Sequence, residues 1–321
     1  MAKVERMGSV DPTRQPTGAV PLGHGSFRSP LARLFSSERP WLWLGPIVVF
    51  LLLIGIYPLL YNLFNSFREF NPMSGKIEPV GWENWSRLIS DGRALAALRV
   101  TATYVVAALL VEFALGLGIA VLFNGGPWAS GLWQSLLILP MVVPPTVAAV
   151  MFNVLENPDN GALFWLIEQV GLIDKTEPLL GGTGRYAMIG VLIPEIWQWT
   201  PFFVLILLAG LKALPTEPLE ASQVDGATPW QSFLHVTLPM LRPMIAVAVL
   251  FRLVDLLKVF DYVYVMTGGG PGTTTNVLSY YAYERSFETI EWGYGSVLGI
   301  AILLLAIVVA NVYARLFKVE W

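Results

Sequence analysis

Six long apolar segments restrict this chain to a membrane-spanning fold. Each holds about 20 mostly apolar residues, the length that a helix needs to cross the hydrocarbon core of a bilayer. Only 13% of the residues are charged, against about 25% in soluble proteins, so a large soluble enzyme is a poor alternative. The segments are continuous rather than alternating, which predicts helices and not barrel strands. We expect an all-α integral membrane protein with spans at residues 41–67, 98–123, 132–155, 187–211, 243–266 and 294–317.

Prolines interrupt the third of these spans at Pro140, Pro144 and Pro145. Proline is tolerated in membrane helices because neighbouring segments satisfy the backbone groups that it leaves unpaired. Two adjacent prolines remove two helical hydrogen bonds in succession. We therefore expect the third helix to kink or break at the Pro144–Pro145 pair.

The N-terminal end of the chain differs from the rest. Residues 1–39 are polar, rich in Pro, Gly, Ser and Arg, and without periodicity, so we expect a flexible cytoplasmic tail before a transmembrane domain at 40–321. Lys and Arg favour the cytoplasmic side of a membrane protein. With the N-terminus inside, ten of them lie on the cytoplasmic side and eight on the other, and Arg39, Arg315 and Lys318 lie directly at helix ends. Both termini are therefore predicted to be cytoplasmic.

The segment between the fourth and fifth spans, residues 211–243, is too polar to cross a membrane but carries a regular pattern. Pro218 suits the first turn of a helix. Gly226 falls where such a helix should end, in a position that favours a left-handed cap. A second short helix should follow over residues 229–236 and close at Pro239. The sequence therefore predicts two short helices joined by a glycine corner.

This pattern resembles the EAA loop of the permease subunits of ATP-binding cassette (ABC) importers. The family form is Glu-Ala-Ala, three residues, Gly, nine residues and Ile-x-Leu-Pro. The chain keeps every spacing from Glu220 through Gly226 to Pro239, with Ser222 in place of Ala and Val236 in place of Ile. The resemblance implies a coupling loop at about 214–240 that inserts into a cytoplasmic ATPase. The residues it assigns to the coupling surface are Glu220, Ala221, Ser222, Asp225, Gly226 and Ala227.

The resemblance extends over nearly the whole chain after Arg39. Val80-Gly81 with Asn84-Trp85, Leu139-Pro140, and the glycine- and threonine-rich stretch 267–275 look like the first permease of maltose/trehalose-type carbohydrate importers. A type I importer permease in the bacterial inner membrane is implied. Its implied partners are a second homologous permease, an ATPase dimer that binds ATP and Mg, an extracytoplasmic solute-binding protein, membrane lipid, and a sugar or polyol. We expect no cofactor in this chain itself and no nucleic-acid partner.

Charged residues inside a membrane are rare, and each is a candidate functional group. The fifth span holds Arg252, Asp255, Lys258 and Asp261, three residues apart. Two interpretations of this spacing stand with similar weight. The charges either neutralise one another as a structural ladder, or they form a polar wall beside the path of the solute. Glu112, in the second span, is expected to be a buried structural or gating carboxylate.

One face of the fourth span combines a carboxylate, an amide and aromatic rings, a set that suits a sugar. Its residues are Glu195, Gln198, Trp199 and Phe202. In the maltose-type resemblance, these residues and Arg252, Leu256 and Val259 of the fifth span occupy positions that contact sugar in that family. Leu256 and Val259 depart from the polar residues of the maltose system. With Asp255, these residues are the predicted substrate path; simple packing is the alternative for the aromatic rings.

Other chemistry finds little support in the sequence. The chain has no cysteine and only two histidines, far apart, so we expect no metal site. The glycine-rich stretch 268–275 lacks the lysine of a phosphate-binding loop, so ATP hydrolysis is assigned to a partner and the chain is not expected to be an enzyme. Two alternatives to sugar import remain: import of a sugar phosphate or other polar solute, and a stand-alone secondary transporter. A membrane-embedded enzyme would need a paired-carboxylate or histidine motif that the loops lack.

Overall fold

The structure is a computed structural model that describes residues 40–71, 73–125, 131–173 and 175–317. The predicted tail at 1–39 lies outside the described residues, as does Lys318. The chain divides between Tyr57 and Pro58 into two compact units. All features from residue 58 onward belong to the second unit.

The first predicted span, 41–67, is helical up to Asn65, and its last two residues, Ser66 and Phe67, lie in a turn. It consists of α2 (Pro40–Leu51), the π-helical turn η1 (Leu52–Ile56) and α3 (Tyr57–Asn65), and its residues 44–65 are long and apolar enough to cross a membrane. The apolar side chains of η1 and most of those in α3 are exposed. Exposed apolar side chains over such a length suit contact with lipid or with another membrane helix.

Three further helices satisfy the same test as single, unbroken spans: α5 (Gly92–Gly125), α9 (Ala187–Ala213) and α16 (Trp292–Leu316). Two bent pairs satisfy it jointly. One joins α6 (Gly131–Val142) to α7 (Pro145–Leu155), and the other joins residues 229–240 to α13 (Arg242–Leu256). The described chain thus has four candidate spans, or six when each bent pair counts as one. This agrees with the predicted all-α membrane fold.

The predicted break in the third span is confirmed. The axes of α6 and α7 differ by 94°. Pro144 has an extended backbone conformation, with ψ at 139°, and Pro145 opens α7. A proline disfavours helical backbone in the residue before it, so Pro145 takes Pro144 out of the helix and the chain turns there.

The fifth span ends earlier than predicted. The helix expected over 243–266 stops at Leu256, and a separate short helix, α14 (Asp261–Met266), follows. Three of the four residues between these helices are apolar and only Lys258 is charged, so the predicted span ran through the break. The Ser279 hydroxyl donates a hydrogen bond to the Val259 carbonyl. This partner comes from a distant part of the chain, and it satisfies a backbone oxygen that a continuous helix would have used.

The connecting segments hold more structure than predicted. Strands β1 (Arg68–Asn71) and β2 (Lys76–Pro79) form an antiparallel hairpin with Arg68 opposite Pro79. The buried Asn84 side chain donates to the backbone carbonyls of Ser66 (3.2 Å) and Arg68 (3.1 Å). The remaining short elements are α4 (Glu83–Ser90), α8 (Ala162–Gln169), α15 (Leu278–Tyr283) and the π-helical η4 (Glu284–Glu288).

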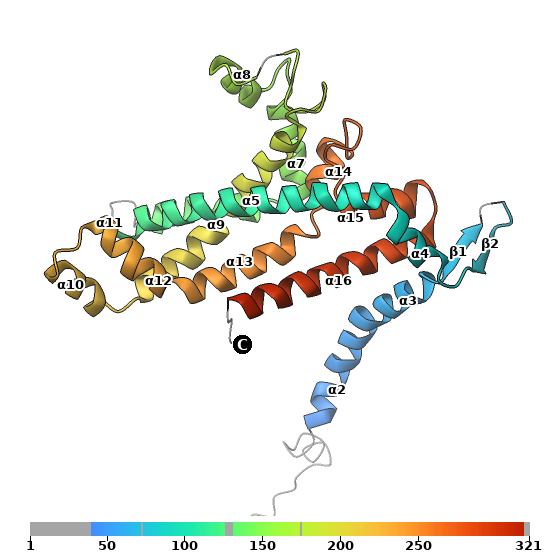
Figure 1. Cartoon of the computed structure of the whole chain (residues 1–321), viewed down its shortest axis with the longest axis horizontal. Helices are drawn as coiled ribbons and strands as arrows, with labels where there is room; N and C mark the ends of the chain where they lie inside the picture. The colour runs from blue at the N-terminus through green and yellow to red at the C-terminus, as the bar shows by residue number, and fades with distance from the viewer. Residues whose placement is uncertain (1–39, 72, 126–130, 174, 318–321) are drawn as a thin grey trace, which may run out of the picture. The chain divides into compact units, whose positions relative to one another are not determined.

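The centre of the second unit is built around α5, which packs along α9 (Figure 1). Helix α13 contacts α5, α9 and α16. Helix α5 approaches α9 closely at Gly116, where an added Cβ would lie 2.3 Å from the Cβ of Phe203. Small residues let membrane helices approach this closely, since packing rather than the hydrophobic effect holds such helices together.

We expect Gly116→Leu to destabilise the chain, because every added atom must displace the α9 backbone at Phe203. Overpacking of this kind costs roughly 1–3 kcal/mol or more. Gly118→Leu is the matched control, since an added Cβ there meets nothing within 4 Å. The apparent thermal unfolding midpoint of the purified chain in detergent should fall for Gly116→Leu and stay near wild type for Gly118→Leu. Equal midpoints for the two variants would refute the packing assignment.

Candidate functional site

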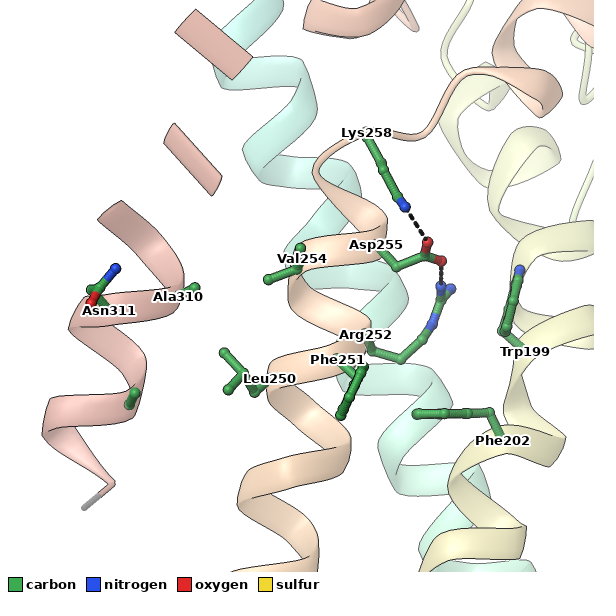
Figure 2. Close-up of a pocket in the computed structure, with 11 residues that line it drawn as sticks. Trp199, Phe202, Leu250, Phe251, Arg252, Val254, Asp255, Lys258, Ala310 and Asn311 are labelled. Carbon is green, nitrogen blue, oxygen red and sulfur yellow. Dashed lines mark hydrogen bonds and ion pairs between the residues drawn. The ribbon is translucent and has the colours of Figure 1, made fainter. Parts of the chain in front are cut away.

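A cavity of about 470 Å³ opens beside α13, between α9 and α16. Figure 2 shows Trp199 and Phe202 on one side, Arg252, Asp255 and Lys258 in the middle, and Ala310 and Asn311 on the other. Four predicted path residues line it. The full lining is Trp199, Phe202, Leu250, Phe251, Arg252, Val254, Asp255, Lys258, Ala310, Asn311 and Ala314.

A buried ion cluster lies at the back of this cavity, centred on Arg252. The guanidinium donates from Nε and from one terminal nitrogen to the two carboxylate oxygens of Glu112, both at 2.8 Å. The same terminal nitrogen donates to Glu195, and the other donates to Asp255 at 2.6 Å. Arg252, Glu112 and Glu195 are at most 2% exposed. Burial of these charges is tolerated because each has an opposite partner and hydrogen bonds of good geometry.

The three-residue spacing allows two ion pairs, Arg252 with Asp255 and Asp255 with Lys258, and both are present. Asp255 accepts from Arg252 with one oxygen and lies 3.3 Å from the Lys258 ammonium with the other. Lys258 lies past the end of α13 and its side chain is 67% exposed. Asp261 does not join the ladder, and it accepts a hydrogen bond from the Thr146 hydroxyl at 2.8 Å. Asp255 and Lys258 therefore pair with each other, as the first interpretation of the charges has it, and they also face the cavity, as the second has it.

Two predicted path residues hold helices together behind the lining. The second carboxylate oxygen of Glu195 accepts from the Tyr104 hydroxyl at 2.8 Å. The Gln198 amide donates to the Val143 carbonyl at 2.6 Å and its oxygen accepts from the Tyr262 hydroxyl. Gln198 thereby bonds α9 to the residues at the α6–α7 break.

The last two predicted path residues, Leu256 and Val259, lie in the buried core that surrounds Tyr104 and are not part of the cavity lining. Their contact with a solute stays a prediction. Phe251 and the α16 residues of the lining were not predicted from the sequence. Asn311 could have been found there, because it is a lone amide within an otherwise apolar stretch.

The Trp199 ring completes the cluster from the cavity side. Its centroid lies 4.6 Å from the guanidinium carbon of Arg252, within the range of a cation–π contact. Trp199 therefore covers the buried cation while its other surface borders the cavity. Phe202, one turn away along α9, extends this aromatic wall.

Removing the central cation should unfold the cluster. In Arg252→Gln, Glu112 and Glu195 would face each other without a neutralising partner, and breaking a buried ion pair from one side costs about 3–5 kcal/mol. Lys258→Gln is the control, because an exposed pair contributes about 0–1 kcal/mol. We expect a much lower apparent unfolding midpoint for Arg252→Gln than for Lys258→Gln, measured on purified chain. Comparable midpoints would show that the cluster is not a stabilising centre.

The predicted two-helix segment forms on the polar stretch after α9. Its elements are α10 (Glu217–Val224), α11 (Pro229–Ser232), the π-helical η3 (Phe233–Thr237) and α12 (Leu238–Met240). The predicted end at Pro239 is wrong, since the helix continues to Met240. The preceding residues adopt π-helical pairing, in which the Leu238 N–H reaches the Phe233 carbonyl, and Pro239 sits in the first turn of α12, where its missing N–H is tolerated.

Gly226 makes the corner as predicted, with φ at +81°. The Gly226 N–H donates to the Gln223 carbonyl and the Ala227 N–H donates to the Ser222 carbonyl, at 3.1 and 2.9 Å. These two bonds form a Schellman motif, which caps α10 and requires a left-handed residue at this position. The Ser222 and Ser232 hydroxyls, 2.7 Å apart, join α10 to α11. Serine in place of the family's alanine thus adds a hydrogen bond across the corner.

The six predicted coupling residues lie together around this corner. Glu220, Ala221, Asp225 and Gly226 are exposed, and Ser222 and Ala227 are half-buried. Val224, at 88% exposed, and Trp230, at 66%, add apolar surface beside them. A compact corner that exposes both acidic and apolar side chains is suited to docking against another protein.

Comparison with known proteins identifies the family. The sequence model described as "Binding-protein-dependent transport system inner membrane component" matches residues 112–318. The chain belongs to this family. The matched region contains the ion cluster, the cavity and the two-helix corner. Membership in this family makes the chain a permease subunit of an ABC importer.

Two relatives and one solved structure agree with this assignment. The probable ABC transporter permease protein y4oQ of Sinorhizobium fredii is 34% identical over 290 residues, covering 89% of this chain and 92% of its own length. The trehalose/maltose transport system permease protein MalF of Thermococcus litoralis is 30% identical over 275 residues, covering 86% and 92%. A chain in the crystal structure of a bacterial ABC transporter involved in the import of the acidic polysaccharide alginate is similar with a TM-score of 0.72, at 22% identity, covering 88% and 96%.

These relatives are named as transport permease proteins, so this permease is a multi-pass membrane transport subunit and not an enzyme. The solved structure carries the type I importer fold, which agrees with the predicted fold class.

One buried carboxyl outside the spans has no partner. Glu156, at the end of α7, is fully buried, and neither of its oxygens has a hydrogen-bond partner among the described residues. Burial disfavours the charged form and raises the pKa of Glu156 to about 8. Gly190 of α9 leaves room for this side chain, because a Cβ there would lie 2.9 Å from a Glu156 oxygen.

The stability of the permease should therefore fall as pH rises. A folded-state pKa above the unfolded value means that the native state holds its proton more tightly. The stabilising contribution is complete below about pH 4.5 and is lost as pH rises to about 8. Between pH 5 and 8, the unfolding midpoint of wild type should decline relative to Glu156→Gln, which has the same shape and no ionisation. Parallel pH profiles for the two proteins would rule out a buried ionisable Glu156.

Proposed function

We propose that this permease forms part of the translocation path for a sugar, either a di- or oligosaccharide or a polyol, and couples its passage to a cytoplasmic ATPase through the corner at Gly226. The composition of the cavity carries the sugar proposal. Trp199, Phe202 and Phe251 offer ring surfaces, and Asp255, Lys258 and Asn311 offer hydrogen-bonding groups. Sugars present apolar faces and hydroxyl edges, so a binding site for them needs both kinds of group. The trehalose/maltose system of the 30%-identical relative supports the same solute class.

The exposed corner supports the coupling proposal. Glu220 and Asp225 place two carboxylates on a surface whose backbone is fixed by the Schellman motif and by the Ser222–Ser232 contact. A basic residue on an ATPase would pair with them. The chain leaves the corner through η3 and α12 and enters α13 at a bend of 65°. Movement imposed on the corner would thus reach the helix that carries Arg252.

The proposed assembly follows from the family. A second homologous permease would complete the path, a cytoplasmic ATPase dimer would bind ATP and Mg, and an extracytoplasmic binding protein would deliver the solute. The membrane is a bacterial inner membrane, with the corner and both termini on its cytoplasmic side. Membership in a binding-protein-dependent family argues against a stand-alone secondary transporter. Exposed Lys258 is the observation that favours the remaining alternative, a sugar phosphate or other charged solute.

The coupling proposal predicts that the corner is needed for assembly. Gly226→Val forces a β-branched residue into a left-handed conformation, which strains and displaces the corner. Gly75→Val is the matched control, because Gly75 also has a positive φ, of +64°, and also has open space around its Cβ position. Tagged chain purified from native membranes should bring an ATPase and a second permease with it in wild type and in Gly75→Val, and should lose the ATPase in Gly226→Val. Equal ATPase recovery in all three would disprove coupling at this corner.

The sugar proposal predicts a role for Trp199. Trp199→Ala should reduce uptake of labelled maltose or trehalose by cells that depend on this permease by roughly tenfold, the order expected for losing one stacked aromatic contact of about 1–2 kcal/mol. Trp197→Ala is the control, since Trp197 packs on Phe152 and does not line the cavity. ATPase recovery should be normal in both. Uptake that is unaffected by Trp199→Ala would remove the cavity from the path.

A further inference from the structure

The charged residues that line the cavity bear on which sugars it accepts. We infer that the part of the path formed by this permease favours uncharged sugars and disfavours acidic ones, because most of the N–H donors of the buried Arg252 are already bound to carboxylates. The inference rests on the proposed sugar function and sharpens it. The related fold of an importer for an acidic polysaccharide does not decide the matter, since charge depends on the residues that line this particular cavity.

Arg252 has almost no capacity left for an incoming anion. A guanidinium has five N–H donors. The Nε donor goes to Glu112, one terminal nitrogen donates to both Glu112 and Glu195, and the other donates to Asp255. One N–H remains uncommitted. The Trp199 ring covers the guanidinium and the residue is 1% exposed, so an acidic group has no surface of Arg252 to meet.

The charges that line the cavity are matched within the chain. Asp255 pairs with both lining cations, Arg252 and Lys258, and Arg252 also pairs with Glu112 and Glu195 behind the lining. Interactions between charges are stronger in a partly buried site than in water, because the effective dielectric constant there is lower. A carboxylate, sulfonate or phosphate on a solute would meet no unpaired cation and would be repelled by Asp255, whose side chain is 38% exposed, and like charges brought together in this way are an effective means of rejecting a wrong ligand.

Among the eleven lining residues, Lys258 is the one cation with an exposed side chain. It is already paired with Asp255 and is largely exposed, so its attraction for an anion is offset by Asp255 and by solvent. The same residues suit a neutral sugar. Asp255 accepts from hydroxyls, while Lys258 and Asn311 donate to them, and the rings of Trp199 and Phe202 cover apolar faces.

Equilibrium binding to the purified membrane complex, without its solute-binding protein, tests the inference. The probes are labelled maltotriose, which is neutral, and labelled trigalacturonate, which is acidic. We expect wild type to bind maltotriose on the order of tenfold or more tightly than trigalacturonate. Higher salt should improve trigalacturonate binding, because it screens the repulsion.

Two variants shift the charge in opposite directions. Asp255→Asn removes the carboxylate from the lining and frees donors on Arg252 and Lys258, so trigalacturonate should gain on the order of tenfold while maltotriose loses at most a few-fold. Lys258→Gln leaves Asp255 without its exposed partner and should weaken trigalacturonate binding further, which keeps the test decisive if Asp255→Asn fails to fold. Asp261→Asn is the control, since Asp261 bonds Thr146 outside the lining.

The outcomes separate the two proposals. Wild type that binds trigalacturonate as tightly as maltotriose, with no gain in Asp255→Asn, overturns the charge inference and leaves a sugar permease standing. A complex that binds neither probe in any variant overturns the sugar proposal, and the charge inference with it. If wild type binds maltotriose more tightly than trigalacturonate, and only Asp255→Asn removes or reverses this preference, then Asp255 determines which solute charge the cavity accepts.

Discussion

The buried contact between Arg252 and two carboxylates is the interaction on which the centre of this permease depends. A lone guanidinium or carboxylate in the hydrocarbon layer would cost several kcal/mol. The three groups are tolerable only together, so α5, α9 and α13 must be placed to bring Glu112, Glu195 and Arg252 into contact. This requirement fixes the back wall of the cavity. Trp199 and Asp255 take their positions from the same arginine, one over its face and the other at its edge.

The corner at Gly226 and the ion cluster are linked by the chain itself. The two short helices of the corner are held by local hydrogen bonds: those of the Schellman motif, of the Ser222–Ser232 contact and of the capping box at Thr228. Those bonds make the corner a unit that moves as one piece. The cluster is equally rigid, for a different reason: its members lose their partners if they separate. Helix α13 connects the corner to the cluster, so under the proposed function solute contacts and ATPase contacts would act on a single helix.

Sequence alone recovered what depends on local pattern. Span positions follow from apolar length, the break at Pro144–Pro145 from proline stereochemistry, and the corner at Gly226 from capping preferences. The features it missed depend on distant partners. Helix α13 ends early where Ser279 satisfies Val259, and Glu112 is bound to a residue 140 positions away. Neither contact leaves a periodic trace. Helical spacing placed Glu195 and Trp199 on one face correctly, but it could not show that Glu195 is consumed by Arg252 while Trp199 reaches the cavity.

The order of the cluster along the chain has a consequence for biogenesis. Helix α13 carries Arg252 and Asp255, and charged residues disfavour the insertion of a helix into the bilayer. Its counter-charges reside on α5 and α9, which are synthesised earlier and are already in the membrane when α13 emerges from the ribosome. Until then Glu112 and Glu195 have no cation, so a nascent chain that stops short of α13 holds two unmatched carboxylates. The arrival of Arg252 supplies that cation and completes the buried cluster.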